Sequence, residues 1–271
     1  MDSERNMRFI RRFNFDVVNQ QRVGLAAQRG WRFDPDAPWL LDQWPVLPFT
    51  VRGDMRHVYG AVTGVESGME FTAFQYFRRP TVVNHKAVGI TVRQTDQYEV
   101  ESVFVVSLPV VMPFAQVWSK RQWYPGGPER CPRPQTHDPK FNRRHRLIDT
   151  DPAVAAALLT PQLVGTVMAL KLGTWSLVGS DLVYTESAVD TGSGPEGVLA
   201  VLARLAQFVP WLPYHLGQPK PGAQPHRAHP GPQQQQPVYP PQPRYSAPQP
   251  YPVQQPYPQQ PYPGPPYLRR L

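Results

Sequence analysis

The last fifth of the chain cannot form a hydrophobic core. Residues 218–271 contain no Asp and no Glu, hardly an aliphatic residue, and about half of the 35 prolines. Such a segment cannot bury enough apolar surface to offset the entropy lost when its backbone becomes ordered. We therefore predict a disordered proline-, glutamine- and tyrosine-rich tail over 218–271, a single folded body over 14–217 and a short basic segment over 1–13.

Six tyrosines recur every five or six residues along this tail, with prolines between them. Prolines favour polyproline II, an extended conformation that loses little entropy on docking into an aromatic-lined groove. Repeated tyrosines offer equivalent contacts that add through effective concentration. The pattern predicts recruitment of a protein partner, with self-association and an inert solubilising role as alternatives. The predicted contacts are Tyr239, Tyr245, Tyr251, Tyr257, Tyr262 and Tyr267.

Charge and cysteine content narrow the class of protein. Five basic residues of the tail leave only +3 of the formal net charge of +8 for the body, which disfavours a nucleic-acid-binding surface. Cys131 is the single cysteine, so no internal disulfide can form.

The N-terminus lacks the apolar run of a secretory signal. The apolar stretch 153–172 is interrupted at Thr160-Pro161-Gln162, which favours two core helices over a membrane span. We expect a cytoplasmic protein and leave its oligomeric state open.

The first half of the body is predicted to contain one helix and four strands. Apolar residues at helical spacing indicate a helix over 16–28 that Gly30 ends. A turn-rich connector follows, in which Asp34 and Asp36 are expected to bond their local backbone, before a helical turn over 39–44. Strands rich in Val, Phe, Tyr and Thr then predict a four-stranded antiparallel meander, whose last two strands form a hairpin at 95–97. The four predicted strands are 57–63, 71–77, 87–94 and 98–108.

The second half of the body is predicted to continue from strands into helices. Prolines make 124–139 a loop, and a basic strand is expected over 141–148. Asp151-Pro152 and Thr160-Pro161 each combine an N-cap side chain with proline at the first helical position, so each predicts a helix start. A hairpin around 179–181 precedes a final helix from Pro195. The fold class expected is α+β, with the meander and about three further strands packed against C-terminal helices.

These second-half motifs resemble those of an uncharacterised family of bacterial proteins that is most common in high-GC actinobacteria. The resemblance rests on Phe141-Asn142-Arg143, Asp151-Pro152 and Leu158-Leu159-Thr160-Pro161, followed by the hairpin and final helix. It covers about residues 15–212 and leaves the tail outside. The family implies a fold and a bacterial setting, but it has no established activity and so implies no catalytic residue.

Two groups of residues carry the elements of catalytic chemistry. A Cys–His pair among Cys131, His137, Asp138 and His145 could activate a thiolate or bind a metal, but the spacing fits no metal motif. An exposed lone thiol is the preferred interpretation. Glu99 and Glu101 share a strand face and could divide acid and base roles, but a solvated pair is preferred because no cleft-forming motif accompanies them. We therefore predict no catalytic residue, no metal, no cofactor and no enzymatic activity.

Two basic runs could contact an anion. One lies in the predicted strand at 140–146, and the other lies at the N-terminus, where Phe9, Ile10 and Phe13 interleave the arginines. Both fit an anionic membrane surface, and the first also fits nucleic-acid phosphates or a solvated outer strand that discourages edge pairing. The candidate contacts are Arg8, Arg11, Arg12, Arg143, Arg144 and Arg146.

The leading hypothesis from the sequence is a non-enzymatic binding or scaffold protein whose tail recruits a partner. The first alternative is a peripheral membrane protein held by its basic, aromatic N-terminus, and the second is an enzyme of unassigned activity. The final helix also admits two interpretations, a lid on the sheet or a membrane-surface helix.

Overall fold

The computed structural model describes residues 15–51, 53–86, 89–94, 98–122, 131–188 and 194–220. The chain divides into one unit from Met1 to Ala223 and a second from Gln224 to Leu271, and all described residues belong to the first. The predicted basic segment at 1–13 and the predicted disordered tail from residue 221 onward lie outside the described residues.

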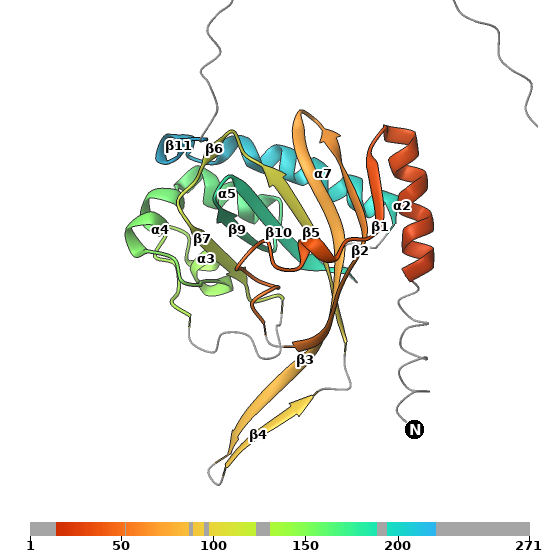
Figure 1. The fold of residues 1–271 in the computed structure, drawn as a ribbon. Coiled ribbons are helices and arrows are strands. Elements are labelled where there is room, and N and C mark those ends of the chain that lie inside the picture. The colour runs from red at the N-terminus through yellow and green to blue at the C-terminus, as the bar shows by residue number, and fades with distance from the viewer. Residues whose placement is uncertain are drawn as a thin grey trace, which may run out of the picture. The chain divides into compact units, whose positions relative to one another are not determined.

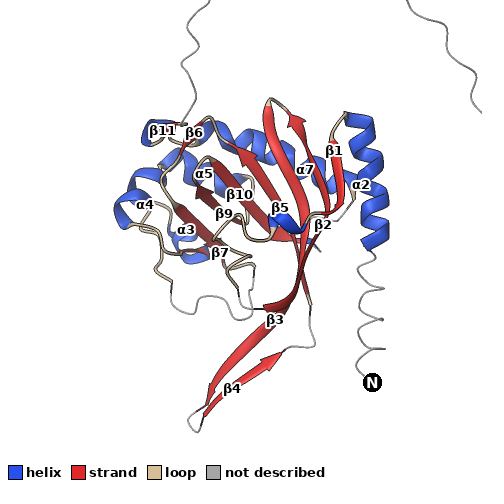
Figure 2. Ribbon diagram, in the orientation of Figure 1, coloured by secondary structure: helices blue, strands red, loops and turns tan. Residues whose placement is uncertain are grey.

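An antiparallel sheet forms the body (Figures 1 and 2). Eight strands follow the order β1-β2-β3-β5-β10-β9-β7-β8, and β4 pairs with β3 outside this path. The predicted α+β class with an antiparallel sheet is thus confirmed. The strands are β1 (Arg32–Asp36), β2 (Gly53–Glu66), β3 (Met69–Lys86), β4 (Gly89–Gln94), β5 (Glu99–Ser107), β7 (Ala115–Ser119), β8 (His145–Leu147), β9 (Thr174–Val178) and β10 (Asp181–Ser187). A separate two-stranded sheet pairs β6 (Val110–Val111) with β11 (Gln218–Pro219).

Helices and an aromatic connector cover opposite faces of this sheet. Helix α7 buries Val198, Leu202 and Leu205 at helical spacing, in the same core cluster as residues of α4 and α5. It crosses behind the strands in Figure 1 and acts as a lid. On the other face, connector residues such as Trp44 and Phe49 pack on the strands. The helices are α2 (Phe15–Arg29), α3 (Pro139–Arg144), α4 (Pro152–Leu158), α5 (Pro161–Ala169) and α7 (Pro195–Phe208), with 3-10 turns η1 (Pro38–Leu40), η2 (Val209–Trp211) and η3 (Tyr214–Leu216).

The two predicted cap-plus-proline starts are both present. The Asp151 carboxylate accepts hydrogen bonds from the amides of Ala153 and Val154, and α4 begins at Pro152. The Thr160 hydroxyl accepts from the Leu163 amide at 3.2 Å, and α5 begins at Pro161. Each cap satisfies amides that a first turn leaves without an intrahelical partner, and this fixes where each helix starts.

The predicted hairpin between 87–94 and 98–108 does not form. Strand β4 pairs instead with the second half of β3, while β5 pairs with the first half. The reason is the length of β3, whose 18 residues provide room for both partners along one edge. Figure 1 shows β3 and β4 projecting together beyond the rest of the sheet.

Two other predictions of local structure were wrong. The first half of the predicted basic strand over 141–148 lies in helix α3, because the Asp138 carboxylate caps the amides of Lys140 and Phe141 as Asp151 caps the start of α4; only His145–Leu147 is a strand. The predicted Asp-Pro-Asp turn is part of β1, which pairs with β2. Pro35 is compatible with β1 because this strand lies at the edge of the sheet, where a missing amide costs little.

Helix α2 contacts the sheet with a buried charged side chain as well as with apolar side chains. Val18, Leu25 and Ala26 are buried, whereas Val17 is exposed. Arg22 is fully buried, and its guanidinium donates to the carbonyl oxygen of Gly60 at 2.6 Å. Burial lowers the pKa of Arg22 to about 10. Gly30 ends the helix with a positive φ of 68°, as expected for a glycine after the last helical residue.

Candidate functional site

The short helix α3 carries two exposed arginines to its C-terminal end. Asp138 accepts hydrogen bonds from the amides of Lys140 and Phe141, at 2.7 and 3.0 Å, and fixes the first turn. Since the helix contains only six residues, Arg143 and Arg144 fall in its last turn, where positive charge complements the helix dipole. Both side chains are exposed.

Directly after α3, buried His145 marks the centre of a group of positive charges. Its ring stacks on Phe141 with centroids 4.1 Å apart, and its Nδ1 lies 3.0 Å from the Phe141 carbonyl oxygen. Burial lowers the pKa of His145, and the charges of Arg144, Arg121 and Arg146 lower it further. The imidazole is therefore neutral at pH 7, and three guanidinium groups lie within electrostatic range of it.

Strand pairing brings two more arginines to the same place. Strand β8 pairs with β7, whose C-terminal end leads to Arg121, and the amide of Lys120 donates to the Arg144 carbonyl at 2.9 Å. On the other side of β8, the Leu147 amide donates to the Pro132 carbonyl at 2.9 Å and places Arg133 beside Arg146. The positive charge of Arg133 contributes to a lowered pKa of Arg146, after burial. We call these five residues, Arg121, Arg133, Arg143, Arg144 and Arg146, the arginine cluster.

The arginine cluster differs from the other arginines with described side chains in having no ion-pair partner among the described residues. Among the residues that the structure describes, none of its five guanidinium groups lies within ion-pair distance of a carboxylate. The other arginines with described side chains have partners: Arg29, Arg32, Arg56, Arg78, Arg79 and Arg204 form ion pairs, and Arg22 donates to main-chain carbonyls. An anion from outside the described body is therefore the natural counter-charge for the cluster.

Arg146 has a different role from its neighbours. Its Nη1 lies 2.6 Å from the carbonyl oxygen of His145 and within 3.4 Å of those of Asn142 and Arg143. These are carbonyls that the end of α3 leaves without an amide partner. Arg146 thus holds the helix end in place, and the exposed contacts are Arg121, Arg133, Arg143 and Arg144.

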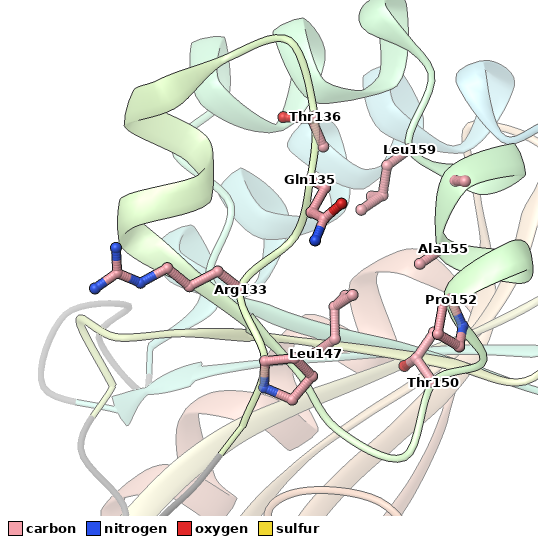
Figure 3. A pocket seen from close by; sticks show the side chains of 10 residues that line it. Arg133, Gln135, Thr136, Leu147, Thr150, Pro152, Ala155 and Leu159 are labelled. Atoms are coloured by element: carbon pink, nitrogen blue, oxygen red, sulfur yellow. The ribbon is translucent and has the colours of Figure 1, made fainter.

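A cavity of about 300 Å³ adjoins the cluster. The loop at 132–136 forms one wall, and α4 with Leu159 forms the other. Figure 3 shows Gln135, Leu147 and Leu159 pointing toward the same space from three sides, while the guanidinium of Arg133 points away from it. Most of the lining is apolar. The lining residues are Pro132, Arg133, Gln135, Thr136, Leu147, Thr150, Pro152, Ala155, Ala156 and Leu159.

A second hollow, of about 540 Å³, lies between the end of β7 and helix α7. Four charged side chains line it, Arg121, Lys171, Glu186 and Arg204, and Arg204 donates two hydrogen bonds of 2.8 Å to the carboxylate of Glu186. The Tyr184 hydroxyl also contacts Glu186 and lies 3.5 Å from Arg204. Because Arg121 belongs to the arginine cluster, this hollow borders the cluster, while its Arg204 is already engaged by Glu186.

The other predicted groups are not arranged for catalysis. Asp138 is engaged as the cap of α3, His145 is buried on Phe141, and Cys131 packs with residues such as Ile148. The thiol is half-buried rather than exposed, and burial raises its pKa, which opposes thiolate formation. Within the described ranges, no group of three His, Cys, Asp or Glu side chains could hold a metal ion.

The prediction of a solvated Glu99–Glu101 pair was wrong. Glu101 is 5% exposed and accepts a hydrogen bond from Gln122, and Glu99 forms an ion pair with fully buried Arg78. Burial raises the pKa of Glu99 to about 7, against the opposing effect of the Arg78 charge. At this strand end, β3 pairs with both residues, and β10 also pairs with Glu101 through Ser187.

The remaining candidates lie outside the described part of the chain. They are Arg8, Arg11 and Arg12 in the N-terminal segment and the six tail tyrosines. Within the described residues no single helix is long and apolar enough to cross a membrane; α4 and α5 reach that length and hydropathy only together, across a bend of 75°.

Sequence reasoning found three members of the cluster and missed two. Arg143, Arg144 and Arg146 belong to one basic run, whereas Arg121 and Arg133 are distant in sequence and join it only through the contacts of β8. The pairing of β7 with β8 leaves no local signature around Arg121, so no pattern in the sequence could have placed it there.

Comparison with known proteins yields one solved structure. No family model and no curated protein matches the chain. The crystal structure of the mycobacterial trehalose monomycolate transport factor A, TtfA, is similar with a TM-score of 0.47 and 13% sequence identity, over 75% of this chain and 98% of that chain. At this score and identity the likeness assigns no role to any residue here, and the resemblance to an actinobacterial family stays a prediction.

Proposed function

We propose that this chain is a non-enzymatic binding protein whose body contacts an anionic membrane surface through the arginine cluster. The observation that supports this proposal is the set of guanidinium groups without carboxylate partners in the described body, at the end of a sheet whose other arginines are paired. Each such cation near an anionic leaflet contributes about 1 kcal/mol to binding.

The surroundings of the cluster favour lipid over nucleic acid. Helix α4 lines the same cavity as Arg133, and no charged residue occurs between Asp151 and Lys171. Ala153, Ala156 and Ala157 are exposed on this uncharged surface. A nucleic-acid footprint needs positive charge along the phosphate backbone, whereas a lipid interface combines cations with uncharged, apolar surface.

Vesicle co-sedimentation of the full chain tests this proposal. We expect binding to vesicles that contain phosphatidylserine, no binding to phosphatidylcholine alone, and weaker but measurable binding of R143Q/R144Q. The control R29Q/R32Q removes the same charge at the opposite edge of the sheet and should bind like the wild type. Equal sedimentation of the two variants, or binding to a DNA duplex but not to vesicles, would contradict the proposal.

The N-terminal segment provides a second contact in this proposal. Phe9, Ile10 and Phe13 interleave its arginines, which is typical of a segment that lies in a membrane interface. Substitution of Arg8, Arg11 and Arg12 by glutamine should weaken vesicle binding further in the R143Q/R144Q background. Unchanged binding would remove this segment from the proposal.

In the same proposal the tail recruits a protein partner to the surface on which the body lies. Its repeated tyrosines and prolines support this role through additive weak contacts. A pull-down that compares the full chain with a chain ending at Lys220 tests it, since that end keeps the β6–β11 pair intact. Equal recovery of partners by both chains would eliminate the recruiting role.

A further inference from the structure

We infer that the cavity beside the arginine cluster binds the alkyl chain of a single-chain anionic amphiphile, whose charged group lies at the rim near Arg133. This inference deepens the proposed function, because it names a molecule that the membrane-facing site would extract or sense.

The cavity is suited to an alkyl chain by its lining. Leu147, Ala155 and Leu159 are buried side chains that present hydrocarbon to it from β8, from α4 and from the residue that ends α4. The two hydroxyls of the lining are engaged elsewhere: Thr136 donates to the Asn142 side chain at 2.8 Å, and Thr150 donates to the Ile148 carbonyl at 2.9 Å. Bound hydrocarbon would thus displace water from apolar surface without removing a hydrogen bond from either hydroxyl.

The size of the cavity limits the ligand to one chain. Ligand sites for drug-sized molecules range from about 300 to 1,000 Å³, and this cavity, at about 300 Å³, lies at the lower end. The branched apolar body of a diacyl lipid needs more space. A diacyl lipid therefore interacts with the arginine cluster from the membrane, and only a single chain enters the cavity.

The position of Arg133 determines the charge and orientation of the ligand. Its stem lines the cavity, and its guanidinium points away from it (Figure 3). The charge of Arg133 also acts on Arg146 of the cluster. An anionic head is therefore neutralised at the rim while the chain points inward between Leu147 and Leu159. Gln135, which points into the cavity, offers an amide to the first polar atoms of the ligand.

Calorimetric titration of the full chain with decyl phosphate, below its micelle concentration, tests the inference. We expect saturable one-to-one binding, at least tenfold weaker binding of both decyl maltoside and inorganic phosphate, and chemical-shift changes at the methyl groups of Leu147 and Leu159. Inorganic phosphate binding as tightly as decyl phosphate, or unshifted Leu147 and Leu159 methyls, would overturn it.

Two matched variants on α4 test where the alkyl chain of the ligand binds. Ala156 lines the cavity, whereas its exposed neighbour Ala157 does not, so A156F should fill the cavity and A157F should not. We expect A156F to weaken decyl phosphate binding at least tenfold, a loss of about 1.4 kcal/mol, and A157F to change it less than about twofold. Equal effects of the two variants would contradict the inference.

The cavity and the membrane proposal can fail separately. R133Q should weaken decyl phosphate binding and leave decyl maltoside binding unchanged, and A156F should leave vesicle binding intact. If A156F blocks decyl phosphate binding but the wild type does not bind vesicles, the result would support the cavity inference and contradict the proposed membrane function. If the wild type binds vesicles but does not bind decyl phosphate, the result would contradict the cavity inference and leave the proposed membrane function standing.

Discussion

At Glu99, burial and ion pairing act in opposite directions on one carboxyl group. The side chain is 18% exposed and pairs with Arg78, which is fully buried. Burial raises its pKa from an ordinary 4.5 to about 7, so the cost of removing the carboxylate from water exceeds the attraction of the nearby guanidinium. A residue that the sequence places in solvent therefore titrates near neutral pH.

The raised pKa of Glu99 determines how the free energy of unfolding changes with pH. A raised pKa means that the folded state binds this proton more tightly than the unfolded chain does. The resulting stabilisation is complete below about pH 4.5 and is lost as the pH rises through 7. The carboxyl ¹³C signal of Glu99 should titrate near pH 7, and R78M should raise that midpoint further.

A comparison of unfolding free energies provides the control for this titration. Glu99→Gln resembles the protonated form at every pH, so its stability relative to the wild type should rise from pH 5 to pH 8. A constant difference between the two proteins over this range, or a Glu99 signal that titrates near 4.5, would show that the ion pair dominates instead.

Two glycines illustrate how local space decides the effect of a methyl group. A Cβ at Gly64 would lie 2.2 Å from Cδ1 of Trp31, whose ring is buried against Phe71, whereas a Cβ at Gly165 in α5 meets nothing within 4 Å. We expect G64A to lower the unfolding free energy by about 1–3 kcal/mol and G165A to raise it by about 0.5–1 kcal/mol. Chemical denaturation measures both, and changes of the same sign would contradict the geometry.

At the scale of elements, the starts of the helices were the most predictable features. A cap residue followed by proline marks α4 and α5 correctly because the signal is local. The side-chain oxygen of the cap residue accepts a free amide of the first turn, and the proline that follows has no amide that needs a partner. The same signal at Asp138-Pro139 also marks α3, but the basic residues that follow favoured a strand interpretation. A cap can therefore outweigh the composition of the residues after it.

The contribution of the Thr160 hydroxyl to the free energy of unfolding should be measurable by substitution of this residue. Thr160→Ala removes the acceptor for the Leu163 amide and should lower the unfolding free energy by about 1 kcal/mol. Thr160→Ser keeps the hydroxyl and should cost far less. Urea denaturation of the two variants checks the prediction, and equal losses would mean that the methyl group of Thr160, rather than its hydroxyl, stabilises this helix start.

Strand pairing and the membership of the cluster were less predictable, because both depend on residues that are distant in sequence. The alternation of β2, β3 and β5 identified three strands, but the choice of partner for β4 depends on the length of β3. In the cluster, the run at 143–146 was visible, whereas Arg121 and Arg133 reach it only through β8. Edge strand β1 was missed because its proline and aspartates are typical of a turn.

At the scale of the whole molecule, the body extends slightly past its predicted end. Gln218 and Pro219 pair with Val111 and Val110, so a chain that ends at Gly217 loses the β6–β11 sheet. A chain ending at Lys220 should unfold at the same temperature as the full chain, and one ending at Gly217 about 2–4 °C lower if the pair contributes about 1 kcal/mol. Equal midpoints for the two truncated chains would show that β11 adds no stability.

In the proposed function, the guanidinium groups of the arginine cluster bind an anionic membrane surface. The partition coefficient of the full chain on phosphatidylserine vesicles, compared between R143Q/R144Q and R29Q/R32Q at physiological salt, tests it most directly. Two cations at about 1 kcal/mol each predict a loss of roughly thirtyfold for R143Q/R144Q and a change of less than about threefold for R29Q/R32Q. Equal losses in the two variants would mean that net charge, rather than the arginine cluster, determines binding, and would contradict the account.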